Sequence, residues 1–163
     1  MTSPFESSPY FSKAQRREAG SPCVLKAMGK AKNKVTLIPE VPVYRVETDA
    51  VPRMPPGNGA KACDWLVLTT EPPMKGLGVE LKGSDYEHAF EQLTSTLNYA
   101  KTCFAIQPAG GVIVFSGRHP AQSKPAWNNL KMKFKKSFGE LTSASYGETY
   151  RADASLKLTK RQR

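Results

Sequence analysis

The alternation of apolar and polar positions first becomes regular at residue 35. Within residues 35–46, most of the alternate positions carry an apolar side chain. This pattern predicts one strand or a pair of strands, interrupted at Pro39 and Pro42. Residues 52–59 contain three prolines and two glycines, so we expect a loop there. β-structure is therefore predicted to open the domain.

Two short strand-like runs follow this loop, over residues 65–70 and 77–82. The segment between them contains Glu71, Pro72 and Pro73, which are residues that favour turns. Two strands at this separation are typical of an antiparallel hairpin with a rather long connection.

A helical period replaces the alternation after Gly83. Ser84 is expected to be the N-cap of this helix, and Glu87, three residues later, would complete a capping box. The apolar stripe follows the spacing i, i+3, i+4, i+7, i+11 and i+14 and consists of Tyr86, Ala89, Phe90, Leu93, Leu97 and Ala100.

The remaining elements complete a pattern of alternating strands and helices. Residues 112–115 are continuously apolar, which suits a strand buried on both faces, so the preceding strand and helix predict a right-handed βαβ unit. Residues 125–138 predict a second helix and residues 141–150 a final strand. The side chains expected to point inward from the second helix are Trp127, Leu130, Phe134 and Phe138. The order predicts an α/β fold, in which helices flank a mixed central sheet.

The chain is expected to divide into three parts. Residues 1–34 are rich in Ser, Pro, Lys and Arg and predict a basic N-terminal arm, with a short helix over residues 12–19 as one option. Residues 35–155 would form the α/β domain, and residues 156–163 a basic tail. At 163 residues the chain suits one domain of this kind.

The charge of the chain favours a polyanionic partner. Lysine and arginine total 24 against 14 acids, for a net charge of +10, which raises the local concentration of nucleic acid. No acid lies between Gln92 and Gly139, whereas six lie between Asp64 and Glu91. The basic residues of the acid-free stretch that we expect to contact nucleic acid are Arg118, Lys124, Lys131, Lys135 and Lys136. For any one of these lysines, a merely solvated surface position is the alternative.

The three cysteines, Cys23, Cys63 and Cys103, are widely spaced and favour neither a zinc site nor a disulfide framework. No apolar run is long enough to span a bilayer, and the first residues lack the pattern of a secretion signal. We therefore expect a reducing, cytoplasmic location and no membrane partner.

Glu80 and Lys82 are the most informative residues of the sequence. Side chains alternate along a strand, so this carboxylate and this ammonium share one face of the second hairpin strand. Burying them costs several kcal/mol unless they are paired or bound to metal. Asp64 begins the first hairpin strand and could lie opposite Glu80, where two carboxylates repel unless a divalent cation lies between them. An ordinary salt bridge on a solvated strand face is the alternative.

Three segments together resemble the PD-(D/E)XK nuclease superfamily, which includes restriction endonucleases and archaeal Holliday-junction resolvases. They are Cys63-Asp64-Trp65-Leu66-Val67, Val79-Glu80-Leu81-Lys82-Gly83 and Ala89-Phe90-Glu91-Gln92-Leu93. The resemblance covers about residues 35–150 in the order of elements and implies a restriction-endonuclease-like core. Cys63 stands where the proline that names the family would be.

The resemblance also implies roles for individual residues. Asp64 and Glu80 would bind Mg²⁺ or Mn²⁺, with the Leu81 carbonyl as a third ligand. Lys82 would be the catalytic lysine, and Gln92 would support the site. The family often adds a glutamate from an N-terminal helix, for which the candidates are Glu18 and, in reserve, Glu40. Relatives often act as dimers, so a homodimer is one expectation here.

The residues and the resemblance together predict a nuclease that uses a divalent metal to hydrolyse phosphodiester bonds, with DNA favoured over RNA. One alternative is an inactive nucleic-acid-binding module, or a subunit of a nucleoprotein complex, whose carboxylates are structural. A second is a protein-interaction partner such as an antitoxin. For Gln92, the alternative is a surface position on the polar flank of its helix.

Overall fold

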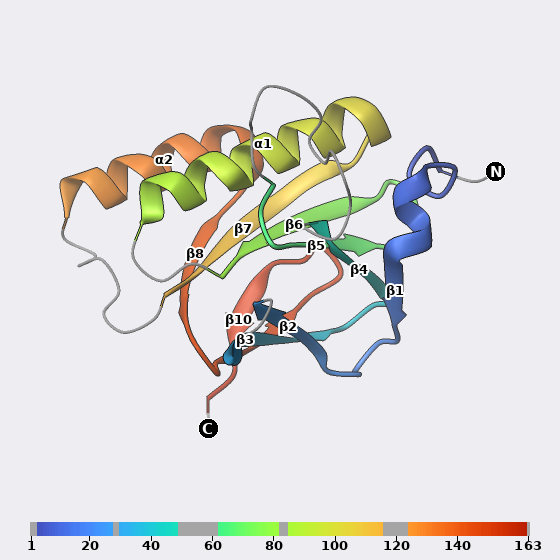
Figure 1. The fold of residues 1–163 in the computed structure, drawn as a ribbon, viewed down its shortest axis with the longest axis horizontal. Coiled ribbons are helices and arrows are strands. Elements are labelled where there is room, and N and C mark those ends of the chain that lie inside the picture. The colour runs from blue at the N-terminus through green and yellow to red at the C-terminus, as the bar shows by residue number, and fades with distance from the viewer. Residues whose placement is uncertain (1–2, 28–29, 49–61, 82–84, 116–123, 163) are drawn as a thin grey trace.

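The computed structural model describes residues 3–27, 30–48, 62–81, 85–115 and 124–162. Within these residues the elements form three layers (Figure 1). A six-stranded sheet lies in the middle, two α-helices pack on one of its faces, and a four-stranded sheet packs on the other. The predicted α/β class with a mixed central sheet is confirmed. The expected helical cover is found on one face only, because a second sheet occupies the other.

The six-stranded sheet contains both antiparallel and parallel pairs. Its strands, in spatial order, are β1 (Ala14–Arg17), β4 (Val43–Glu47), β5 (Trp65–Thr69), β6 (Lys75–Glu80), β7 (Gln107–Phe115) and β8 (Leu141–Ser145). Pairing is antiparallel from β1 to β6 and parallel from β6 to β8. The β5–β6 hairpin predicted from the two strand-like runs is therefore confirmed.

Both helices are crossovers between neighbouring parallel strands. Helix α1 (Tyr86–Phe104) connects β6 to β7, and α2 (Pro125–Phe138) connects β7 to β8. Because the strand order proceeds in one direction, right-handed crossovers bring both helices to the same face. The N-cap of α1 is Asp85, whose side chain accepts a hydrogen bond from His88 N, and the predicted cap Ser84 lies outside the described residues.

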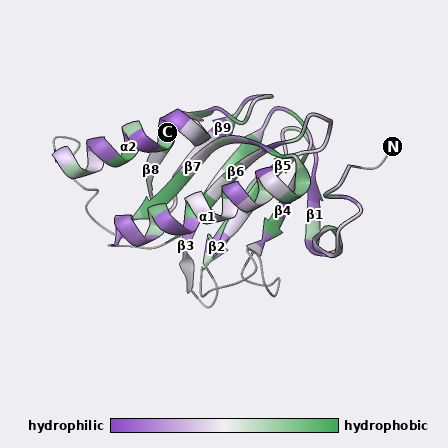
Figure 2. Ribbon diagram, turned by 90° about the horizontal axis from the view of Figure 1, so that it is seen from above, coloured by the Kyte–Doolittle hydropathy of each residue, from purple (hydrophilic) through white to green (hydrophobic). Residues whose placement is uncertain are grey.

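Glycines of the central strands allow the helices to approach the sheet closely. A Cβ atom on Gly78 would lie 2.9 Å from Leu93 Cδ2 of α1, and one on Gly111 would lie 2.8 Å from Phe134 Cζ of α2. Of the inward positions predicted for α2, only Leu130 is not buried. Figure 2 shows apolar residues along β6 and β7 and polar residues on the two helices. The outer surfaces of the helices thus carry mainly polar groups, with Met132 of α2 as an exposed apolar exception.

The N-terminal residues are part of the folded domain and do not form a separate arm. The expected helix over residues 12–19 is replaced by a 3₁₀ turn, Pro9–Lys13, followed directly by β1. Strand β2 (Cys23–Ala27) and strand β3 (Lys30–Pro39) pair in the second sheet. Phe5 is fully buried in the core beneath the helices. These apolar residues are too far apart in sequence to produce a recognisable period.

The C-terminal strand predicted over residues 141–150 is two strands in different sheets. Strand β8 ends at Ser145, and β9 (Thr149–Ala152) pairs in parallel with β3 after a turn at Gly147, whose φ is +83°. The predicted basic tail continues the second sheet, because β10 (Leu158–Lys160) pairs with β9 and Leu156 is buried. The second sheet therefore has the order β10-β9-β3-β2.

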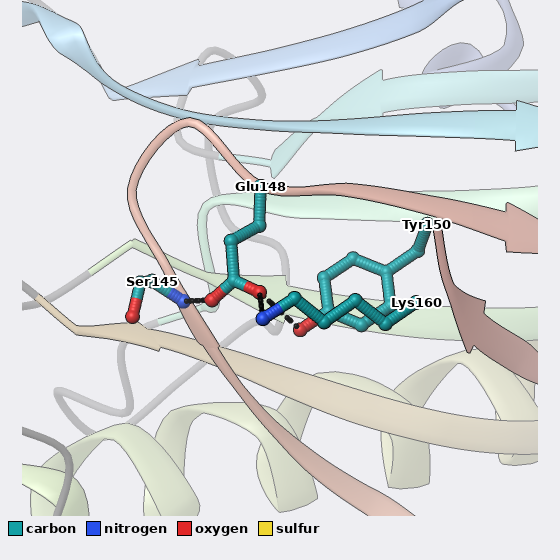
Figure 3. A network of polar contacts seen from close by, with 4 residues as sticks. All are labelled: Ser145, Glu148, Tyr150 and Lys160. Carbon is teal, nitrogen blue, oxygen red and sulfur yellow. Dashed lines mark hydrogen bonds and ion pairs between the residues drawn. The ribbon is translucent and has the colours of Figure 1, made fainter. Parts of the chain in front are cut away.

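Glu148 holds the turn at which the chain crosses between the sheets (Figure 3). Its Oε1 accepts a hydrogen bond from Ser145 N at 2.5 Å, and its Oε2 lies 2.6 Å from Lys160 Nζ. Tyr150 Oη donates to Oε2 at 3.3 Å. Burial alone would raise the pKa of the Glu148 carboxyl, but the hydrogen bonds from Lys160 and Ser145 outweigh burial and lower that pKa from its usual value.

This network is expected to make stability depend on acid pH. A lowered folded-state pKa means that Glu148 stabilises the fold fully above its unfolded pKa, and that this contribution is lost as the pH falls through the folded-state value. Glu148→Gln should therefore lose less stability than wild type between pH 7 and pH 3 in urea unfolding. Lys160→Ala should cost at most about 1 kcal/mol at pH 7, because the lysine side chain is 64 % exposed. Identical acid dependence of wild type and Glu148→Gln would contradict this assignment.

Candidate functional site

Asp64 and Glu80 face each other at one end of the central sheet. Trp65 pairs with Val79 in the β5–β6 ladder, which puts the residue before β5 opposite the last residue of β6. Asp64 N donates to Glu80 Oε2 at 3.1 Å, and Leu81 N donates to Asp64 Oδ2 at 2.7 Å. Each carboxylate thus accepts a backbone hydrogen bond from the opposite strand. The predicted juxtaposition of these two acids is confirmed.

The two carboxylates differ in their exposure to solvent. Glu80 is completely buried, whereas Asp64 is half-buried. Side chains of β6 alternate, and Leu77, Val79 and Leu81 point toward the second sheet. Glu80 is therefore on the face that α1 covers. A carboxylate in such a position is costly unless hydrogen bonds or a cation compensate its charge.

Cys63 lies next to the carboxylate pair and is held in its protonated form. Burial is the main cause that raises the pKa of its thiol to about 12, and the negative charges of Glu80 and Asp64 act in the same direction. Its Sγ donates to Trp65 O at 3.3 Å. A thiolate is the form that attacks substrates and binds metals, and burial disfavours that form at Cys63.

Helix α1 anchors the segment that leads into Asp64. Gln92 Nε2 donates to Ala62 O at 3.1 Å, and Thr96 Oγ1 accepts from Cys63 N at 2.9 Å. Gln92 is only 5 % exposed, so the alternative of a surface position is wrong. Its Oε1 accepts no hydrogen bond from any residue that the structure describes. Gln92 therefore positions the strand entry that carries Asp64.

Glu18 and Glu40 are not brought to this site. Arg17 pairs with Val43, which in turn pairs with Thr69, the end of β5 that lies away from Asp64. Glu18 follows at that far end, exposed and in an ion pair with Arg16 at 2.7 Å. Glu40 is exposed at the end of β3 in the other sheet. The expected extra acid is therefore neither of these residues, because the N-terminal helix that would carry it is a strand.

The basic positions of α2 lie at different distances from the carboxylates. Strands β6 and β7 are parallel, with Glu80 level with Ile113, and α2 runs back from that end of the sheet. Lys124 precedes α2 and is therefore the closest of the lysines, whereas Lys135 and Lys136 lie in its last turn, about 15 Å further along the helix. Lys131 lies between them, and all four lysines are exposed. Lys135 also approaches Glu140 at 3.7 Å.

Two of the residues predicted for the site lie outside the described residues. These are the predicted catalytic lysine, Lys82, and the predicted phosphate contact, Arg118. Among the described residues, no group of three or more His, Cys, Asp or Glu side chains is placed to hold a metal ion. Among the described residues, the Leu81 carbonyl is a further oxygen next to the two carboxylates.

Comparison with known proteins adds no family to this geometry. No family model matches the chain, and no match was found among curated proteins or solved structures. In the described part of the chain, no helix has the length and apolar character needed to cross a membrane.

Proposed function

We propose that this protein is a divalent-metal-dependent nuclease that hydrolyses phosphodiester bonds, with DNA as the favoured substrate and a restriction-endonuclease-like core. The observation that carries the proposal is the pair Asp64 and Glu80, held together by reciprocal backbone hydrogen bonds at one end of the sheet. A net charge of +10 supplies the attraction to a phosphate backbone.

The side chains at the pair suit a hard cation. Asp64 and Glu80 offer carboxylate oxygens, and Leu81 offers a backbone carbonyl. Mg²⁺ and Mn²⁺ prefer oxygen ligands, and Mg²⁺ commonly binds through one or two carboxylates while keeping several waters. Two carboxylates and a backbone carbonyl form an all-oxygen set, which suits either ion.

Each residue of the site would have a separate role in hydrolysis. When bound, the metal would supply Lewis-acid stabilisation of charge on the scissile phosphate. Asp64 and Glu80 would hold it, while Gln92 keeps the entry to β5 in place. Lys82, two residues after Glu80, would neutralise charge on the phosphate as a water oxygen bonds to phosphorus and the leaving oxygen departs with a proton.

The test is a metal titration with cleavage as its readout. Wild-type protein would be incubated with plasmid, a branched junction and single strands over increasing Mn²⁺, with and without chelator. Cleavage is expected to rise with Mn²⁺ and to stop with chelator. Lys82→Ala should keep binding but lose turnover, whereas Lys75→Ala, the same change at the other end of β6, should cut normally.

Two outcomes would contradict the proposal. Cleavage that persists in chelator would exclude a metal mechanism of this kind. Salt-sensitive binding without cleavage at any Mn²⁺ concentration would favour the alternative of an inactive nucleic-acid-binding module, in which the carboxylates are structural.

A further inference from the structure

A second polar site lies on the opposite face of the central sheet from the carboxylate pair. A groove of about 370 Å³ runs between β1, β4 and β5 of the central sheet and β2 of the second sheet, and we name it the β1–β2 groove. The side chains that define it are Arg17, Val24, Lys26, Arg45, Glu47 and Trp65. None of these residues belongs to the carboxylate pair or to the basic helix α2.

The groove carries an excess of positive charge. It contains three cationic side chains and one carboxylate, and in the described part of the chain none of the three cations forms an ion pair. Burial, followed by the nearby charge of Arg17, lowers the pKa of the Arg45 guanidinium, with Glu47 opposing this in part. Arginines that approach one another without a carboxylate between them are stabilised by a bound anion.

The Arg45 side chain is held in place by contacts within the protein. Its Nε donates to Gln15 Oε1 at 2.8 Å, and its Nη1 donates to Val24 O. Its Cζ lies 5.4 Å from the centre of the Trp65 ring, and Trp65 is itself anchored by a hydrogen bond from its Nε1 to Lys26 O at 2.9 Å. A guanidinium held in this way loses little conformational entropy when it binds an anion.

The positions of the cations suit an extended anion better than a single free one. Arg17 is level with Val43, while Trp65 is level with Glu47, four residues further along β4. At about 3.3 Å per residue the groove therefore extends over about 13 Å. A single free anion would fill only part of this length, whereas a nucleic-acid strand presents a row of phosphates along its backbone.

The groove also reaches the end of the sheet where Asp64 lies. Trp65 follows Asp64 directly, and side chains of successive strand residues point to opposite faces. From these observations we infer that Arg17, Lys26 and Arg45 form a binding subsite for the phosphate backbone of a nucleic acid that passes around this end of the sheet. The inference rests on the proposed function, since it assigns the substrate strand a path to the same carboxylates.

Binding measured without metal tests the subsite separately from cleavage. Arg17→Gln/Lys26→Gln removes two cations and leaves Arg45, which supports the local structure, in place. The matched control is Arg151→Gln/Lys157→Gln, which removes one arginine and one lysine from exposed positions of the second sheet and its tail. Fluorescence anisotropy of a labelled duplex in EDTA would give Kd over a range of salt concentrations.

The slope of log Kd against log salt concentration should fall by about 2 in the Arg17→Gln/Lys26→Gln variant, since each lost phosphate contact removes about 0.9. Kd itself should rise at least about 10-fold relative to the control variant. Equal slopes in the two variants would overturn the subsite while leaving cleavage by wild type intact. Pyrophosphate binding would be measured in the same two variants. If Arg17→Gln/Lys26→Gln lost pyrophosphate binding while its salt slope for the duplex stayed unchanged, the groove would hold a free anion, and this result would also overturn the subsite. A reduced slope in a protein that never cuts would support the subsite and reject the nuclease.

Discussion

Replacing Glu80 by glutamine is expected to abolish Mn²⁺-dependent cleavage, with a rate loss of more than about 100-fold. Substitution of a residue that hydrogen-bonds a metal ligand already lowers metal affinity or activity by about 10- to 100-fold. Substitution of the ligand itself should have a larger effect. Glutamine has nearly the same volume, and its amide oxygen can still accept the hydrogen bond from Asp64 N. The substitution therefore removes the charge of Glu80 while it preserves the shape of the site.

The matched control for this substitution is Glu71→Gln. Glu71 is an exposed acid in the connection of the same hairpin, so the change in net charge is identical. Cleavage and Mn²⁺ binding by calorimetry should be lost only in Glu80→Gln, and thermal unfolding in EDTA should show that both variants are folded. Cleavage by Glu80→Gln at the wild-type rate would reject the carboxylate pair as the active centre.

Replacing Phe5 by alanine is expected to lower the free energy of unfolding by about 3–5 kcal/mol. Phe5 is fully buried, and its ring centre lies 5.8 Å from that of Phe104 at the end of α1 and 6.4 Å from that of Tyr44 on β4. Truncation leaves a cavity between the N-terminal segment, the helix and the sheet. For a chain of this size the melting temperature should fall by roughly 10 °C.

Phe11 provides the comparison within the same aromatic cluster. Its ring centre lies 6.0 Å from that of Phe5, but its side chain is 36 % exposed, so Phe11→Ala should cost roughly 1 kcal/mol. Urea unfolding at one pH would measure both variants. Equal stability of Phe5→Ala and wild type would mean that residues 3–13 contribute nothing to the fold, as a separate arm would.

Residues with local periodicity could be placed from the sequence. The boundaries of α2 agree with the predicted range 125–138, and the buried run 112–115 forms the second half of β7. The hairpin could also be predicted from the sequence, because only a short connection separates its two strands. It brings Asp64 opposite Glu80. In each of these cases the signal and the contact lie within about 20 residues of one another.

Contacts between distant segments could not be placed in the same way. Leu25 and Val35 form one buried cluster with Leu156, and no periodic pattern connects positions more than 100 residues apart. Phe5 and Cys23 likewise looked like isolated apolar residues within a basic segment. The groove residues Arg17, Lys26 and Arg45 come from three strands, and only the register of β1 with β4 and the packing of β2 bring them together.

The sequence by itself determined the alternation of strands and helices, the βαβ unit that contains α1 and the Asp64–Glu80 pair, because each depends on side-chain periodicity or on a short connection. Tertiary structure alone decided that both helices share one face, that the chain ends form a second sheet and that Gln92 is buried. Those features follow from burial of apolar surface between segments distant in sequence, whose partners become defined only when the whole core closes.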